Sequence, residues 1–368
     1  MGTNKPHLVF ACRWNKEIEK TWSGSAYAVF QQLNHYFAVE RLDIKDTISV
    51  RLFKLMRKFH IVHGDPSLLS VIRTYNRKYK KAEKESNIIF QFDETPWTSR
   101  TKNYIYQDLS VSYICYMREH DPVAYSYSGF SNIPKGQLIK REKTQKDFYE
   151  HCSGIFTMGR WLADFMVKEC GIPKEKIHVV GAGINVPVGP EDYSQKRGNK
   201  ILFVGKDFER KGGKLVVEAF RILRKKYRTD AELYIVGPEE NPLKEEISGV
   251  NFVGNMDKER VADYFKMCDV FCMPSYFEAF GIAFCEALAN GLPCIARNKY
   301  AMAEIIHDGE DGYLIDEDDT EVLAQKMDQL LANNQIFQTV RSKRNEYIKK
   351  YSWENVVEKM QSVICGDD

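Results

Sequence analysis

The chain has 368 residues, of which 43% are hydrophobic and 28% are charged. These proportions exclude an intrinsically disordered protein, and the length suits two folded domains. Lysine and arginine number 53 against 51 for aspartate and glutamate, so the bulk charge gives no reason to expect a nucleic-acid partner.

The cysteines and the apolar runs indicate a compartment. Nine cysteines are scattered along the chain, an odd number that favours free thiols in a reducing environment over a disulfide framework. The opening stretch MGTNKPHLVFACRW has too short an apolar run for a signal peptide, and no run of eighteen apolar residues occurs. We therefore expect a cytoplasmic location.

Short apolar strands alternate with helical stretches in the first half of the chain. A helix is predicted at residues 23–37, and strands are predicted at 7–13, 88–94, 103–110, 154–158 and 176–183. Such alternation predicts βαβ units and a parallel sheet.

The pattern restarts after a polar segment that contains proline and glycine, at about 183–199, which is the best linker in the chain. A second strand series follows at 201–207, 232–238, 250–255, 269–275 and 292–298. The sequence thus predicts two successive doubly wound α/β units. Ligands of such units bind beyond the carboxyl ends of the strands.

A basic loop follows the first strand of the second series. The stretch FVGKDFERKGGKLVVEAFRIL, 203–223, would place Lys206, Arg210 and Lys211 beside a helix N-terminus. Free amides, the helix dipole and fixed cations together favour an anion such as a diphosphate. A solvated basic turn is the alternative. The glycine spacing does not match a Walker A loop, and GAGINV at 181–186 lacks the third glycine of a dinucleotide fingerprint.

Two glutamates, Glu278 and Glu286, lie eight positions apart in FEAFGIAFCEALANG. If both were helical, about 12 Å along the axis would separate them, too far for an acid/base couple on one bond but suitable for two parts of one long ligand. The amides of Phe280, Gly281 and Ile282 lie between them at a predicted helix start, where phosphate or sugar oxygens bind. Two unrelated surface carboxylates remain the alternative.

The context of these glutamates resembles the E-x7-E signature of family-4 retaining glycosyltransferases, also called glycosyl transferases group 1. The stretches that carry the resemblance are PSYFEAFGIAFCEALANGLPCIA, VGKDFERKGG, NFVGNMDKERVADYFKMCDVFCMPS, HDGEDGYLIDEDD and YSWENV. The resemblance implies a GT-B fold, in which two Rossmann-like domains face each other across a cleft. Residues 1–186 would bind the acceptor, with a C-terminal helix at 352–368 packing back on them. Residues 199–351 would bind the nucleotide sugar.

The resemblance also implies roles for residues of the second domain. Glu286 would accept hydrogen bonds from the ribose, and Glu278 with the amides of Phe280–Ile282 would hold the donor sugar. The cations Lys206, Arg210 and Lys211 would neutralise the diphosphate as it leaves. The first of these is usually arginine in the family, and lysine lacks its bidentate fork. Gly237 and the turn at Asn255-Met256 lie where the base pocket is expected.

The first domain departs further from the family. Gly24, in the turn Trp22-Ser23-Gly24-Ser25, corresponds to the family's glycine-rich turn after the first strand, and the resemblance implies that it binds the donor. The family's frequent active-site histidine falls on Asp108 by strand order. A carboxylate there would orient a sugar hydroxyl or would merely cap the strand end, and both interpretations stay open. His120 is the rival candidate, although a loop position explains it as well.

The implied reaction transfers a sugar, with retention, from a UDP- or GDP-linked donor to a glycan, a lipid-linked molecule or another hydroxyl acceptor. No metal or other cofactor is expected, because the basic loop takes the metal's place. The Asp316-Glu317-Asp318-Asp319 run contains an Asp-x-Asp pattern, yet helix capping or solvation explains it better. The alternatives are a sugar-nucleotide epimerase, a phosphorylase, or a nucleotide-sugar-binding protein without catalysis.

A basic amphipathic stretch at 48–64 has Leu52, Phe53, Met56 and Phe59 on one face and Arg51, Lys54, Arg57 and Lys58 around the other. A second basic run lies at 73–84. We favour a surface helix packed on the sheet, with peripheral contact to an anionic membrane as the alternative. Trp97, Tyr104 and Tyr106 are candidates either for stacking on a sugar or for the core.

Overall fold

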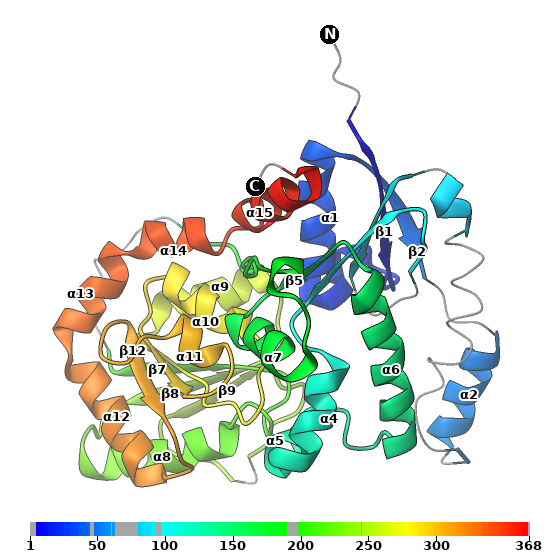
Figure 1. Ribbon diagram of the computed structural model, residues 1–368. Coiled ribbons are helices and arrows are strands. Elements are labelled where there is room, and N and C mark those ends of the chain that lie inside the picture. Colours follow the sequence, from blue (N-terminus) through cyan, green and yellow to red (C-terminus); the bar gives the residue numbers. More distant parts are fainter. Residues whose placement is uncertain are drawn as a thin grey trace. The chain divides into compact units, whose positions relative to one another are not determined.

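The structure, a computed structural model, describes residues 5–44, 48–59, 61–62, 80–84, 86–92, 97–189, 198–243 and 245–366 (Figure 1). The chain divides into two compact units, one formed by residues 1–181 and 353–368 and the other by residues 182–352. Most of the basic run at 73–84 and part of the linker at 183–199 lie outside the described residues.

The first unit is a six-stranded parallel sheet with helices on both faces. Its strand order is β2-β1-β3-β4-β5-β6. Its elements are β1 (His7–Cys12), η1 (Ile18–Gly24), α1 (Ser25–Tyr36), β2 (Ala38–Asp43), α2 (Ile48–Lys58), β3 (Ile88–Phe92), β4 (Lys102–Gln107), α4 (Val111–His120), α5 (Pro122–Tyr127), α6 (Lys135–His151), β5 (Gly154–Thr157), α7 (Arg160–Cys170), η2 (Lys174–Lys176), β6 (Ile177–Val179) and, from the C-terminus, α15 (Trp353–Cys365).

Successive side chains of these strands point to opposite faces of the sheet, and a hydrophobic core lies on each face. One face carries aromatic rings, with Phe10 stacked on Phe90 at 5.3 Å and meeting Phe30 of α1 at 5.7 Å. The opposite face sends Ile105 and Ile155 into a cluster with residues of α6 and α7. Because successive side chains of a strand point to opposite faces, the runs of consecutive buried apolar residues in β1 and β3 require a cover on both sides. Helices α1 and α15 pack against each other in this unit (Figure 1).

The second unit is also a six-stranded parallel sheet, in the order β9-β8-β7-β10-β11-β12. Its helices α8 and α12 pack together, while α10 lies against α11 and α14 (Figure 1). Its elements are β7 (Lys200–Val204), α8 (Gly213–Lys226), β8 (Glu232–Val236), β9 (Val250–Gly254), α9 (Lys258–Met267), β10 (Val270–Cys272), α10 (Ile282–Ala289), β11 (Cys294–Arg297), α11 (Met302–Ile305), β12 (Gly312–Ile315), α12 (Thr320–Ala332), α13 (Asn334–Ser342) and α14 (Arg344–Lys350).

The prediction of two doubly wound α/β units is confirmed, and every predicted strand is present. Two strands were not predicted. Both β2, with the sequence AVERLD, and β12, with GYLI, lie at sheet edges. Strand β2 is charged and has no buried residue, so it lacks the apolar run that reveals a central strand, whereas nothing in its burial explains why β12 was missed.

Tyr104 and Tyr106 belong to the core, where each is nearly inaccessible to solvent. Their candidacy as sugar-stacking residues was therefore wrong. Trp97 stacks on His151 with ring centroids 3.9 Å apart, and its indole nitrogen donates to Asp147 at 2.7 Å.

Candidate functional site

The strand order of the second unit creates a switch point. Strands β8 and β9 extend to one side of β7, while β10, β11 and β12 extend to the other. The loops that follow β7 and β10 therefore leave adjacent strands in opposite directions, and the space beyond such a point is where doubly wound sheets bind ligands. The predicted basic loop follows β7, and Glu278 follows β10.

The basic loop, residues 205–212, brings two of its three cations to Glu278. Lys211 forms an ion pair with Glu278 through its Nζ, and Arg210 donates from Nη1 to the same carboxylate oxygen at 3.3 Å. Arg210 is also held from within the loop, because Asp207 accepts from its Nε at 3.2 Å. Lys206, the third predicted cation, is solvent-exposed at the start of the loop.

Gly212 lets this loop approach the loop after β10. It has a φ of 78° and caps α8, and a Cβ placed on it would lie 2.6 Å from the carbonyl oxygen of Pro274. A larger residue would force the two loops apart. The close approach therefore depends on glycine both for its backbone conformation and for its missing side chain.

Glu278 is ionised although it is largely buried. Burial alone would raise the pKa of its carboxyl, but Lys211 and then Arg210 outweigh burial, and the pKa lies below the ordinary value of 4.5. Two cations that share one carboxylate fix its position as well as its charge. The arrangement presents an oriented carboxylate beside the N-terminus of α8.

The segment between the two glutamates forms a helix start, as predicted. Gly281 caps α10 with a φ of 93°, and Ile282 is the first helical residue. The first amides of a helix have no carbonyl acceptor four residues earlier. Phe280 and Gly281 are buried, while Ile282 is half-buried. The residues Phe280–Ile282, whose amides lie at this helix start, thus follow Glu278 closely in the sequence.

Glu286, within α10, accepts backbone hydrogen bonds that sequence reasoning missed. Its Oε1 accepts from the amides of Asn185 at 2.9 Å and Val186 at 3.0 Å. The residue is 7% exposed, and burial raises the pKa of its carboxyl to about 7, although the two amides oppose this rise. Among the described residues, Oε2 receives no hydrogen bond. No sequence pattern connects residue 286 with a segment a hundred positions earlier.

The predicted base-pocket residues follow the neighbouring strands. Gly237 comes directly after β8 with a φ of 119°, and a Cβ there would lie 2.7 Å from the backbone of Gly205. Asn255 is exposed and Met256 is half-buried, both directly after β9. The structure therefore places these residues at the same sheet edge as the basic loop.

The acidic run 316–319 is used within the protein. Asp319 caps α12 by accepting from the amides of Glu321 and Val322 at 2.8 and 3.0 Å. Asp316 accepts from Asn298 at 3.0 Å, and Asp318 pairs with an arginine of β11. Asp319 thus caps a helix, as predicted, while Asp316 and Asp318 each contact another side chain of the protein.

In the first unit the switch point lies between β1 and β3. Gly24 caps α1 with a φ of 99°, and Trp22 and Ser23 before it also have positive φ values, 50° and 57°. Such values are strained for residues with a side chain, and strain of this kind concentrates at functional turns. The Trp22 ring lies 5.7 Å from Phe92, the last residue of β3.

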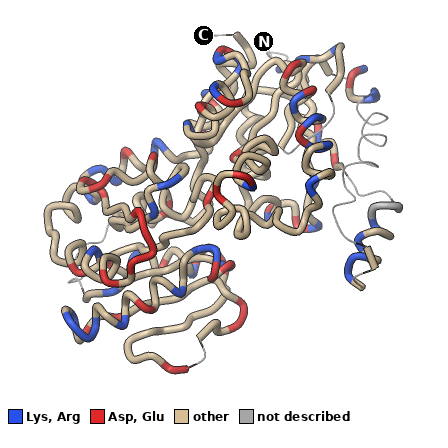
Figure 2. The backbone as a smooth tube through the Cα atoms, turned by 60° about the horizontal axis from the view of Figure 1, so that its bottom comes forward, with Lys and Arg blue, Asp and Glu red and all other residues tan. Residues whose placement is uncertain are grey.

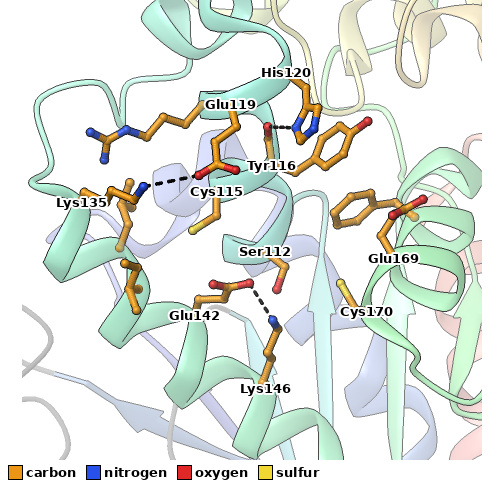
Figure 3. A pocket seen from close by; sticks show the side chains of 14 residues that line it. Ser112, Cys115, Tyr116, Glu119, His120, Lys135, Glu142, Lys146, Glu169 and Cys170 are labelled. Atoms are coloured by element: carbon orange, nitrogen blue, oxygen red, sulfur yellow. Dashed lines mark hydrogen bonds and ion pairs between the residues drawn. The ribbon is translucent and has the colours of Figure 1, made fainter.

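Asp108 and His120 do not share a site. Asp108 is half-buried directly after β4, whereas His120 ends α4, which at ten residues is about 15 Å long. His120 is exposed, stacks on the Tyr116 ring at 4.0 Å and contacts the Tyr116 carbonyl through Nδ1 at 2.9 Å. It lines a pocket of about 330 Å³ formed by residues of α4, α6 and α7, in which Glu142 pairs with Lys146 at 2.8 Å (Figure 3). Asp108 does not line this pocket.

The amphipathic stretch at 48–64 begins with helix α2, and its predicted apolar face is only partly covered: Phe53 and Met56 are half-buried, whereas Leu52 and Phe59 are exposed. Leu52, Leu55 and Phe59 are 57%, 53% and 65% exposed. The favoured interpretation, a helix packed on the sheet, is therefore wrong for Leu52 and Phe59. Figure 2 shows basic positions recurring along the same helix, at the right of the picture. Within the described ranges, no helix combines the length and apolar character needed to cross a membrane.

The chain was compared with known proteins. Residues 191–354 match the family model described as glycosyl transferases group 1. A phosphatidyl-myo-inositol mannosyltransferase of Mycobacterium leprae is 30% identical over 173 residues, which cover 45% of this chain and 46% of that protein. An uncharacterised glycosyltransferase of Methanocaldococcus jannaschii is 27% identical over 186 residues, 50% of this chain and 52% of the relative. The chain thus spans about half the length of the curated relatives it matches.

The solved structures extend the similarity to the whole chain, at the level of fold. A glycosyltransferase from Rickettsia africae aligns with a TM-score of 0.67 at 16% identity, covering all of both chains. WaaG, a glycosyltransferase involved in lipopolysaccharide biosynthesis, aligns with a TM-score of 0.68 at 16% identity, covering 98% of this chain and all of that one. Anabaena HepE in complex with UDP and glucose aligns at 0.65 and 13% identity, covering 98% of this chain and all of that one. These similarities confirm the predicted fold class.

Proposed function

Because residues 191–354 belong to the glycosyl transferases group 1 and the chain has the GT-B fold, we propose that the protein is a retaining glycosyltransferase. It moves a sugar from a UDP- or GDP-linked donor to a hydroxyl acceptor and needs no metal. The observation that carries this proposal is the convergence of Arg210 and Lys211 on Glu278 at the switch point between β7 and β10.

The donor's diphosphate binds the basic loop. Lys206, Arg210 and Lys211 supply three positive charges, and the N-terminus of α8 adds its free amides and dipole. During transfer the bond between the anomeric carbon and the phosphate oxygen breaks, and the diphosphate carries away the electron pair. Fixed cations that meet this growing charge lower the barrier because they need no reorganisation.

The donor sugar lies against Glu278 and the amides at the start of α10. An ionised carboxylate accepts hydrogen bonds from sugar hydroxyls, and the two cations that lower the pKa of Glu278 keep it ionised at neutral pH. The acceptor hydroxyl forms its new bond to the anomeric carbon on the face that the diphosphate leaves, and the departing phosphate takes its proton. This account gives retention without a covalent intermediate on the protein.

The nucleoside extends from this point to Glu286. The Oε1 atom of Glu286 already accepts from two amides, so Oε2 is the atom we assign to a ribose hydroxyl. Gly237, Asn255 and Met256 flank the base at the ends of β8 and β9.

The first unit binds the acceptor. Asp108 follows a strand of its sheet, and we assign to it the orientation of the acceptor or sugar hydroxyl. The family's histidine could take up a proton near neutral pH, whereas an aspartate at this position acts mainly by accepting a hydrogen bond. The acceptor is a glycan, a lipid-linked molecule or another hydroxyl compound.

A lipid-linked acceptor would explain why helix α2 combines exposed apolar residues with a basic face. Leu52 and Leu55 of this helix and Phe59 directly after it are exposed, and Arg51 together with three other lysine or arginine residues forms the basic face. Such a helix lies in the interface of an anionic membrane. Leu55→Asp should reduce binding to vesicles that contain anionic phospholipid at least about tenfold, since one buried leucine contributes roughly 1.5–3 kcal/mol. The matched control is Val322→Asp, which changes an exposed valine of the second unit and should leave vesicle binding as it is.

Metal independence rests on the partners of the acidic run, whose aspartates cap a helix or pair with side chains of the protein. Turnover should persist in EDTA. A cytoplasmic setting belongs to the same proposal and is supported by the nine described cysteines, none of which forms a disulfide.

The test is a donor screen with UDP- and GDP-sugars, which measures nucleoside diphosphate release and, by NMR, the anomeric configuration of the product. Transfer with retention supports the proposal. An altered sugar nucleotide without transfer would indicate an epimerase, and turnover that requires inorganic phosphate would indicate a phosphorylase. Tight donor binding without any turnover would indicate a binding protein.

A further inference from the structure

Arg297 is a buried charge close to the proposed donor site. It is the last residue of β11, which pairs with β10, and it is 5% exposed. A buried guanidinium is unfavourable unless its N–H groups are paired. The hydrogen-bond and ion-pair partners of Arg297 therefore indicate its role.

The carbonyl partners belong to the turn that leads to Glu278. The Nε atom of Arg297 donates to the carbonyl of Ser275 at 3.1 Å, and Nη2 lies 3.4 Å from the carbonyl of Pro274. The guanidinium carbon also lies 4.9 Å from the centroid of the Tyr276 ring. Three consecutive residues of the turn thus contact one side chain.

A second arginine holds the next part of the same turn. The Nη1 atom of Arg210 donates to the carbonyl of Phe277 at 2.8 Å, and the carbonyl of Arg210 accepts from the amide of Tyr276 at 2.9 Å. Residues 274–277 are therefore fixed by Arg297 at one end and by Arg210 at the other. Glu278 follows directly, so the placement of its carboxylate depends on the conformation of this turn.

We propose that Arg297 is a positioning residue for sugar transfer, which acts through the turn 274–277 on the carboxylate of Glu278. This inference rests on the proposed function and deepens it. The planar guanidinium supplies several N–H donors in fixed directions, so one side chain can bond to two carbonyls and lie over a ring at once. An ammonium group has no plane and would lose this combination.

Asp318 completes the arrangement. It forms an ion pair with Nη2 of Arg297, and its own side chain is half-exposed. The carboxylate thus pairs with the same nitrogen that lies near the Pro274 carbonyl, and this pairing helps to orient the guanidinium. The acidic run thereby acquires a role in the site that does not involve a metal ion.

The variants are Arg297→Lys and Asp318→Asn, with Arg228→Lys as the matched control. Arg228 pairs with Asp328 at 2.6 Å in the same unit, outside the turn. We expect kcat to fall at least tenfold in Arg297→Lys and at least threefold in Asp318→Asn, with the affinity for UDP or GDP alone within twofold of the wild type. The control should keep the wild-type kcat. A general loss of structure would instead weaken nucleotide binding and turnover together.

A double-mutant cycle with Glu278→Gln tests whether Arg297 acts through Glu278. The effect of Arg297→Lys on kcat should shrink to less than twofold in the Glu278→Gln background, because residues that act through one another are not additive. Full additivity would overturn the inference, as would wild-type kcat in both Arg297→Lys and Asp318→Asn. A wild-type chain that transfers no sugar would overturn the proposed function itself and the inference with it. If Arg297→Lys does not fold, the half-exposed Asp318→Asn decides the question.

Discussion

Replacing Glu286 with glutamine should change how the stability of the second unit depends on pH. Burial raises the pKa of Glu286 from its ordinary value of 4.5 to about 7, so between these values the folded chain holds a proton that the unfolded chain has released. Stability contributed by this group is therefore present below about pH 4.5 and is lost as pH rises toward 7. Each pKa unit corresponds to about 1.4 kcal/mol, so the whole loss is roughly 3 kcal/mol.

Glutamine resembles the protonated carboxyl and does not titrate. Its carbonyl can still accept from the amides of Asn185 and Val186, while its amide nitrogen falls where Oε2 receives no hydrogen bond among the described residues. Burying that nitrogen costs about 1–3 kcal/mol, but this cost is the same at every pH. The difference in unfolding free energy between Glu286→Gln and the wild type should therefore shift by about 3 kcal/mol in favour of the variant from pH 4.5 to pH 8.

The assay is urea unfolding at pH 5, 6, 7 and 8, followed by circular dichroism. All five tryptophans lie in the first unit, so their fluorescence does not report on the second one. The matched control is Glu259→Gln, which changes an exposed glutamate of α9 that is solvated in both states and should follow the wild-type pH profile. A difference that stays constant within about 0.5 kcal/mol from pH 5 to pH 8 would refute the reasoning, because the predicted shift over this range is several times larger.

Three further variants address the rest of the site. Lys211→Ala should lower kcat about 100-fold or more, because it removes a preorganised cation from the leaving group, whereas Lys214→Ala on the exposed face of α8 should stay within twofold; near-normal kinetics in Lys211→Ala would remove the diphosphate assignment. Asp108→Asn should reduce turnover at least about tenfold with an unchanged melting temperature, and an unchanged rate would leave Asp108 without a role in transfer. Gly237→Ala should destabilise by about 2 kcal/mol or more in urea unfolding, because its Cβ would clash and its φ is positive. Gly309→Ala, with a φ of 81° and open space around it, shows the cost of the backbone alone, and equal losses in both would refute the steric argument.

The sequence predicted the parts of the fold whose physical cause is local. Central strands such as β7 and β8 are buried on both faces, so each shows as a short apolar run that needs no knowledge of its neighbours. The helix after the basic loop was visible from its apolar spacing, and the start of α10 was visible from its glycine. Edge strand β2 was missed because little of its surface is buried, which removes the signal, whereas the burial of β12 gives no such reason.

The candidate site was predicted in its components and not in its connections. Lys211, Arg210 and Glu278 were each selected from their own loops, by charge and by position after a strand. Their convergence on one carboxylate oxygen depends on β7 and β10 being neighbours, which results from the order of all six strands. A sequence pattern in one loop carries no information about that order.

The contacts of Glu286 and Arg297 show most clearly what could not be predicted from the sequence. Sequence patterning identified an amphipathic helix, a doubly wound fold and a glutamate at a fixed spacing, because periodicity and turn chemistry act over a few residues. Only the tertiary structure determines that Glu286 accepts hydrogen bonds from the amides of residues 185 and 186. It also determines that Arg297 contacts the turn before Glu278. These bonds form between segments that the sheet brings together, and burial in that setting decides the charge and the orientation of each side chain.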